Sequence, residues 1–211
     1  MDVYPELPMK RMNTITALRL DRDRDLSADI VPEAYFRCQA IRELSFPWAT
    51  NAFERQFTEA RLAWTDKYLY IHLWAKDSWI VVGEDSLEVF LQPEDGRYWG
   101  WQANASGVGS GFLVADWGLG PVEKRHIESR PKTQTQWKTR RHDAGWVLEL
   151  KIPFAKDLGR VPRRGETWRV TFNRTDVDRQ GRATLSTFSD LSPDDLGWFH
   201  QPQGFGQLVF G

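Results

Sequence analysis

Hydrophobic and polar residues alternate with a period of two along most of this chain. The clearest case is the pair of segments FTEARLAWT (57–65) and YLYIHLWAK (68–76), which Asp66-Lys67 joins. A two-residue connection between alternating segments is typical of a β-hairpin. One face of the second segment carries Leu69, Ile71, Leu73 and Ala75, and the other carries Tyr68, Tyr70, His72 and Trp74. The pattern predicts two antiparallel strands with one face in a hydrophobic core.

The same alternation continues through the rest of the chain. Further candidate strands are DSLEVFLQ (85–92), RYWGWQANA (97–105), TQTQWKTRRH (133–142), GWVLELKIP (145–153), ETWRVTFNRT (166–175), ATLSTFS (183–189) and FGQLVFG (205–211). YFRCQAIREL (35–44) is a candidate edge strand. About ten strands without a helical period predict an all-β fold, an antiparallel β-sandwich of jelly-roll or immunoglobulin-like type. No repeat or linker divides the chain, so residues 1–211 are expected to form one domain.

Composition narrows the functional classes. The 211 residues carry a net charge of −1 with both signs interspersed, which predicts no nucleic-acid partner and no anionic membrane partner. No apolar run approaches the roughly 20 residues that span a bilayer. The segment MDVYPELPMKRMN lacks the apolar stretch of a signal peptide. The protein is therefore expected in the cytoplasm or, if an export signal has been removed, in the periplasm or outside the cell.

Aromatic and polar residues suggest a binding face. Of the 11 tryptophans, most are expected in the core and one or two at a platform for a flat ligand such as a sugar ring. The two-residue period of a strand places Glu88 on the outer face of the sheet, because its neighbours point inward. The same reasoning places further polar residues on outer faces, namely Gln102, Asn104 and Asn173. Carboxylate and amide groups complement a neutral polyol, because each hydroxyl both donates and accepts. The alternative explanation is that these polar residues face outward only because they are exposed to solvent, and that they bind no ligand.

Several segments together resemble the family 9 carbohydrate-binding modules in order and spacing. They are ARLAWTDKYLYIHLWAKD, EDSLEVFLQPED, WGWQANASG, GWVLELKIPF, ETWRVTFNRTDVD and FHQPQGFGQLVFG. The resemblance covers residues 57–211 and is greatest to the stand-alone members with a Phe-His-x-Pro and FG-x-L-x-F ending. It implies a β-sandwich related to DOMON domains. It also implies non-catalytic binding of sugars at the chain ends of xylan or cellulose, in support of polysaccharide breakdown, with a mono- or oligosaccharide as the partner.

The resemblance also implies individual contacts. The family's polar sugar contacts fall on Glu88, Gln102, Asn104 and Asn173, with Gln102 standing where a known member has arginine. Its two stacking tryptophans fall at Val82 and Phe199, so the expected aromatic contacts are Trp79, Trp198 and Phe199. Members often carry structural calcium, and Asp77 is the position that matches a calcium ligand.

Two other functions remain open from the sequence. DOMON-like sandwiches also house haem, which needs axial ligands such as His with Met. All three methionines lie in residues 1–12, which leaves a pairing that involves His72. A glycoside hydrolase needs two carboxyl groups, about 5–5.5 Å apart in a retaining enzyme. Glu84 and Glu88 are roughly 13 Å apart on an extended strand, which argues against this chemistry.

Overall fold

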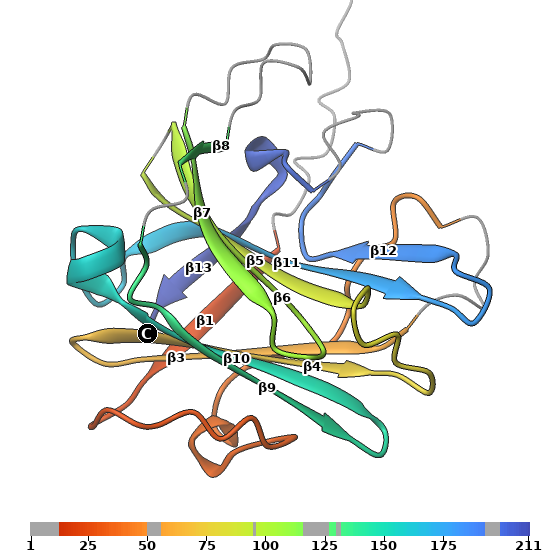
Figure 1. Ribbon diagram of the computed structural model, residues 1–211. Helices are drawn as coiled ribbons and strands as arrows, with labels where there is room; N and C mark the ends of the chain where they lie inside the picture. The colour runs from red at the N-terminus through yellow and green to blue at the C-terminus, as the bar shows by residue number, and fades with distance from the viewer. Residues whose placement is uncertain (1–12, 50–55, 95, 116–126, 130–131, 193–198) are drawn as a thin grey trace, which may run out of the picture.

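The computed structural model describes residues 13–49, 56–94, 96–115, 127–129, 132–192 and 199–211 (Figure 1). Its strands are β1 (Thr14–Arg19), β2 (Ala40–Ile41), β3 (Thr58–Trp64), β4 (Tyr68–Lys76), β5 (Ser86–Glu94), β6 (Arg97–Asn104), β7 (Gly109–Ala115), β8 (Ile127–Ser129), β9 (Gln136–His142), β10 (Gly145–Pro153), β11 (Thr167–Val177), β12 (Ala183–Thr187) and β13 (Gly206–Phe210). Short helical turns are η1 (Glu33–Tyr35), η4 (Phe154–Leu158) and η5 (Pro202–Gly204). Among these described residues, no helix has the length and apolar character needed to cross a membrane.

Two β-layers face each other, and β1 belongs to both (Figure 1). The upper layer of the view has the order β8-β7-β6-β5-β11-β13, with β12 beside β11. The lower layer has the order β3-β4-β10-β9, with β2 beside β3. β1 pairs in parallel with β13 and then with β3, whereas the other ladders between described strands are antiparallel. The result is a β-sandwich in which one strand passes from layer to layer.

The hydrophobic core lies between the two layers and takes alternate residues from each strand. β5 contributes Leu87, Val89 and Leu91, and β4 contributes its predicted aliphatic face, all of them fully buried. Burial of apolar surface, worth about 25 cal/mol per Å², stabilises this arrangement. Trp64, Trp101, Trp146 and Trp168 are among the largest buried side chains. The expectation that tryptophans mainly fill the core is thus confirmed for these four.

The sequence located most strands after residue 57 but failed in the first 50 residues and at β7 and β8. The candidate edge strand 35–44 is a strand only at Ala40–Ile41, because η1 and the turn after it occupy the preceding residues. β1 was not predicted, because it pairs with the distant strands β13 and β3 and, within the described residues, with no neighbouring strand that would mark it as half of a hairpin. β7 was also missed, because it begins within a glycine-rich segment that has few side chains to show a strand pattern.

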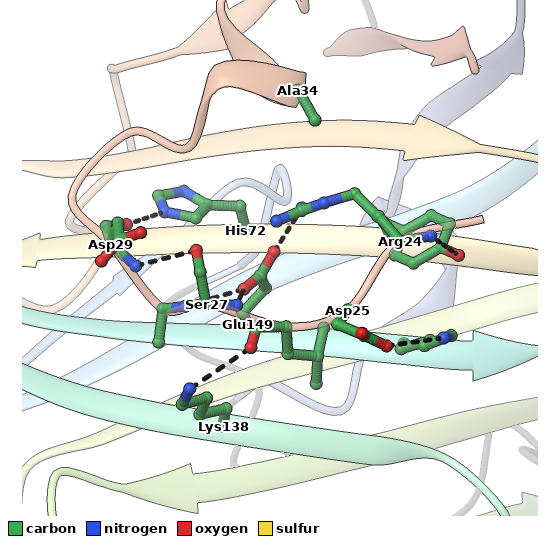
Figure 2. A network of polar contacts seen from close by, with 12 residues as sticks. Arg24, Asp25, Ser27, Asp29, Ala34, His72, Lys138 and Glu149 are labelled. Atoms are coloured by element: carbon green, nitrogen blue, oxygen red, sulfur yellow. Dashed lines mark hydrogen bonds and ion pairs between the residues drawn. The ribbon is translucent and has the colours of Figure 1, made fainter. Parts of the chain in front are cut away.

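Residues 20–31, which contain no regular secondary structure, lie on the outer face of the lower layer (Figure 2). Glu149 of β10 is fully buried beneath them and holds them in place. Its Oε1 accepts a hydrogen bond from Arg24 at 2.5 Å, and its Oε2 accepts from the backbone N–H groups of Ser27 and Ala28 at 2.8 and 2.9 Å. Three donors thus satisfy one buried carboxylate, which ties an irregular segment to the sheet.

Replacing Glu149 with glutamine is expected to lower the free energy of unfolding by about 2–4 kcal/mol, because Arg24 loses its buried counter-charge. Urea unfolding at neutral pH measures this change. The control is Arg19→Gln, which removes an exposed ion pair with Asp66 and should cost less than about 1 kcal/mol. Equal losses in the two variants would contradict the anchoring role of Glu149.

Candidate functional site

A row of polar residues crosses the outer face of the upper layer. Backbone register places Gln102 of β6 beside Glu88 of β5, and Glu88 beside Asn173 of β11. The row extends to Ser110 of β7 on one side and Thr187 of β12 on the other. Neighbouring strands lie about 4.8 Å apart, so the row spans about 20 Å on rigid elements. The structure therefore brings together three of the four polar residues that the sequence singled out.

Glu88 is the carboxylate of this row. Its neighbours Leu87 and Val89 are fully buried in the core, which places Glu88 on the outer face. No described residue donates a hydrogen bond to this carboxylate or forms an ion pair with it, although protein atoms leave Glu88 only partly exposed. Loss of hydration therefore raises the pKa of Glu88 from 4.5 to about 7.

Asn173, the neighbour of Glu88, is fully buried, and in the part of the chain that the structure describes only the oxygen of its side-chain amide has hydrogen-bond partners. Its Oδ1 accepts hydrogen bonds from the hydroxyls of Thr171 at 3.1 Å and Thr187 at 2.7 Å, which fixes the orientation of the amide. Its Nδ2 has no hydrogen-bond acceptor among the described residues. A buried unpaired donor costs about 1–3 kcal/mol, so a ligand that accepts from it would recover this energy.

Asn104 has a different environment from the other predicted polar residues. Its Cα pairs with that of Ser86, one row along the strands from Glu88. Its Oδ1 accepts from the backbone and hydroxyl of Ser106 and from the backbone of Val108, at 3.1, 2.6 and 3.1 Å. Asn104 therefore organises the turn between β6 and β7, and its contact with a ligand stays a prediction.

Aromatic rings gather on one side of the row, around Phe90 of β5. The ring of His200 stacks on Phe90 with centroids 4.8 Å apart, and its Nδ1 lies 2.5 Å from the hydroxyl of Tyr98. Phe199 is only 6% exposed and meets the ring of Trp48 edge-on at 5.6 Å. Because Trp48 is less deeply buried, it is the more accessible ring of this pair.

On the other side of the row, the loop of residues 77–85 leads from β4 into β5. Trp79 in this loop is 49% exposed, and the guanidinium of Arg179 lies 4.3 Å from its ring centroid. The loop also accepts a hydrogen bond from Asn104 at the Gly83 carbonyl, at 3.4 Å. Trp79 is thus an accessible ring in the loop that leads into β5, whereas Trp198 lies outside the described residues.

Asp77 lies in a buried cluster with Asp85 and Asp176, in which one carboxylate oxygen of each residue lies within 4.8 Å of the other two. Burial, with Asp77 nearby, raises the pKa of Asp85 to about 6. The guanidinium of Arg174 enters the cluster, bonds to Asp176 and lies 3.4 Å from Asp77. Calcium requires six to eight oxygen ligands. The guanidinium of Arg174 already contacts carboxylate oxygens of Asp77 and Asp176 that a calcium ion would need as ligands. The cluster therefore does not fit the calcium ion expected at Asp77.

Three residues near the row were missed by sequence reasoning. Thr187 lies in a predicted strand, but the sequence does not show that this strand pairs with β11. His200 belongs to the Phe-His-x-Pro ending, where nothing marks its ring as a partner of Phe90. Trp48 follows the candidate edge strand 35–44, in a segment for which the pattern predicted no element.

Comparisons with known proteins relate this chain to carbohydrate-binding modules. The family model "Carbohydrate family 9 binding domain-like" matches residues 33–211. A carbohydrate binding module family 9 from Caldicellulosiruptor kristjanssonii in complex with cellotriose is similar in structure, with a TM-score of 0.68 and 15% identity over 93% of each chain. A module of the same description and organism, in complex with glucose, gives a TM-score of 0.65 and 16% identity over 94% of this chain and 95% of that one.

A protein from Bacteroides uniformis ATCC 8492, to which carbohydrate binding has been ascribed, is similar to this chain as well. Its TM-score is 0.70 with 17% identity, over 95% of this chain and 100% of that chain. At such identities these likenesses establish a shared fold. No curated protein matches the chain.

Glu88→Gln is expected to stabilise the protein increasingly as the pH rises. The native carboxyl keeps its proton to about pH 7, whereas the unfolded one loses it near the ordinary pKa of 4.5. The stability of the wild type therefore falls with rising pH across this window, and glutamine does not titrate. Thermal melts from about pH 4.5 to about pH 8 measure the difference. Glu94→Gln, at the exposed end of β5, is the control, and a pH-independent difference for Glu88→Gln would contradict the prediction.

Proposed function

Because the chain belongs to the carbohydrate family 9 binding domain-like family, we propose that its outer polar row binds a neutral mono- or oligosaccharide without altering it chemically. One juxtaposition in the row supports this function. The Glu88 carboxylate receives no hydrogen bond from the described residues, and the adjacent Asn173 amide has a buried donor without an acceptor among them. Vicinal hydroxyls complement both groups, because each hydroxyl donates and accepts.

The proposed contacts differ in strength. Glu88 accepts from sugar hydroxyls and, where it is ionised above about pH 7, forms charge-assisted hydrogen bonds, the stronger type. Asn173 donates from an amide that two threonine hydroxyls hold in one orientation. Gln102 is exposed, with its Nε2 3.4 Å from the Ser86 hydroxyl, and so has room to adjust to the ligand. Strand register fixes the spacing of these groups, and that spacing selects the stereochemistry of the hydroxyls.

The family and its solved relatives suggest the ligand class. The structures from Caldicellulosiruptor kristjanssonii hold cellotriose and glucose. By analogy, the proposed ligands are fragments or chain ends of cellulose- or xylan-like polysaccharides, and the protein supports their breakdown. Trp48 and Trp79 are the described rings on the two sides of the row that are accessible enough to stack on a sugar. Stacking by Trp198 stays a prediction from the sequence.

The two alternative functions have less support. A hydrolase needs a second carboxyl group near Glu88, and in the described residues its neighbours along the row are amides and hydroxyls. A haem site would need an accessible axial ligand. His72 is fully buried, its ring lies 5.1 Å from that of Tyr35, and its Nε2 donates to the Asp29 carbonyl at 2.9 Å (Figure 2). Neither chemistry is favoured by these contacts.

Calorimetric titration with glucose, cellobiose, xylose and xylobiose tests the proposed function. Glu88→Gln and Gln102→Ala are each expected to raise the Kd of a bound sugar about 10-fold, which corresponds to about 1.4 kcal/mol for a lost polar contact. Gln136→Ala is the matched control, because Gln136 is an exposed glutamine on β9 of the lower layer. Circular dichroism confirms that each variant is folded.

A sugar bound by the wild type with the same Kd in both site variants would contradict the location of the site. Failure of the wild type to bind any of the four sugars would contradict the proposed ligand class. Release of reducing sugar from an oligosaccharide would contradict the non-catalytic role.

A further inference from the structure

We propose that Arg174 is the resident cation of the cluster formed by Asp77, Asp85 and Asp176, and that it takes the place a calcium ion would need there. The loop of residues 77–85 is then held in position without metal. This inference stands on the contacts of Arg174 and is independent of the proposed sugar site.

Five oxygen atoms surround the guanidinium of Arg174. They belong to the backbone carbonyls of Lys76 (2.9 Å) and Phe57 (3.2 Å), the hydroxyl of Thr58 (3.5 Å), and the carboxylates of Asp77 (3.4 Å) and Asp176. Carbonyl, hydroxyl and carboxylate oxygens are the set that calcium prefers in proteins. Here the same set surrounds a side chain of the protein itself.

Further oxygens of the cluster are committed to backbone donors. Asp85 accepts hydrogen bonds from the N–H groups of Val81 and Val177, both at 2.8 Å. Asp77 Oδ1 accepts from the N–H of Trp79 at 2.7 Å. Because calcium needs six to eight oxygens at about 2.3–2.6 Å, it would have to displace the guanidinium to complete its coordination.

The charge of Arg174 is permanent in this position. Its side chain is 1% exposed, and a guanidinium does not lose its proton in proteins. Buried carboxylates this close together repel one another unless a cation lies between them. Arg174 supplies that cation with directional donors, so its contribution does not depend on the metal concentration of the surroundings.

The cluster also shapes the loop that leads into β5. The backbone contacts of Asp77 and Asp85 fix the loop at Trp79 and Val81, and the contact between Asp85 and Val177 ties it to the end of β11. An internal cation therefore keeps the loop that carries Trp79 in position whether or not calcium is present.

The first experiment measures metal binding by the wild type and by Asp77→Asn. Thermal melts in calcium and in chelator, and terbium luminescence sensitised by tryptophan, report binding at any site. The expected result is that the wild type and Asp77→Asn respond to the metals in the same way, because this cluster does not take part. A calcium-dependent rise in the wild-type Tm that is lost in Asp77→Asn would overturn the proposal.

The second experiment removes the internal cation. Arg174→Gln is expected to lower the Tm in chelator by about 10 °C and to create a calcium-dependent recovery and a terbium signal that calcium displaces. Arg174→Lys keeps a positive charge and is expected to stay insensitive to calcium. Arg19→Gln removes a more exposed arginine and controls for the loss of one positive charge.

A folded Arg174→Gln variant that gains no response to calcium or terbium would also overturn the proposal, because the guanidinium would then not stand in for a metal ion. If Arg174→Gln does not fold, the comparison of the wild type with Asp77→Asn decides the question alone.

Discussion

Burial of alternate residues of β5 is the constraint on which the proposed binding face depends. Leu87, Val89 and Leu91 enter the core, so the two-residue period of a strand sends Glu88 to the outer face. A slip of one residue would exchange the two faces and bring the carboxylate into the core. Hydrophobic burial therefore supplies the energy that holds a poorly hydrated carboxylate, with a pKa of about 7, at the centre of the polar row.

The sequence could predict which face each polar residue takes, but it could not predict which residues become neighbours. Alternation alone placed Glu88, Gln102 and Asn173 on outer faces. Their alignment in one row depends on the pairing of β5 with β11, whose paired residues lie about 80 positions apart, and on the irregularity in the ladder of β5 and β6 between Leu91 and Glu94. Pairing of distant strands follows from tertiary packing, which no local pattern encodes.

Buried charges show the same limit. The alternation of the strand places Arg174 on the same face as Phe172 and opposite Asn173. No local pattern indicated that Asp77, almost a hundred residues earlier, would lie beside Arg174. Residues 20–31 depend likewise on a distant carboxylate, that of Glu149 (Figure 2). In both places a buried ion pair fixes an irregular segment onto a regular sheet, because a buried charge without a partner is too costly to keep.

The most direct test of the sugar site observes its side-chain amides by NMR. A ¹⁵N-labelled protein is titrated to saturation with a sugar that calorimetry shows to bind, and the NH₂ resonances of Asn173 and Gln102 are followed. Both amides are predicted to shift in proportion to occupancy, with the buried Asn173 amide exchanging more slowly with solvent in the complex. Saturation that leaves both amides unchanged, with shifts confined to other parts of the protein, would contradict the account.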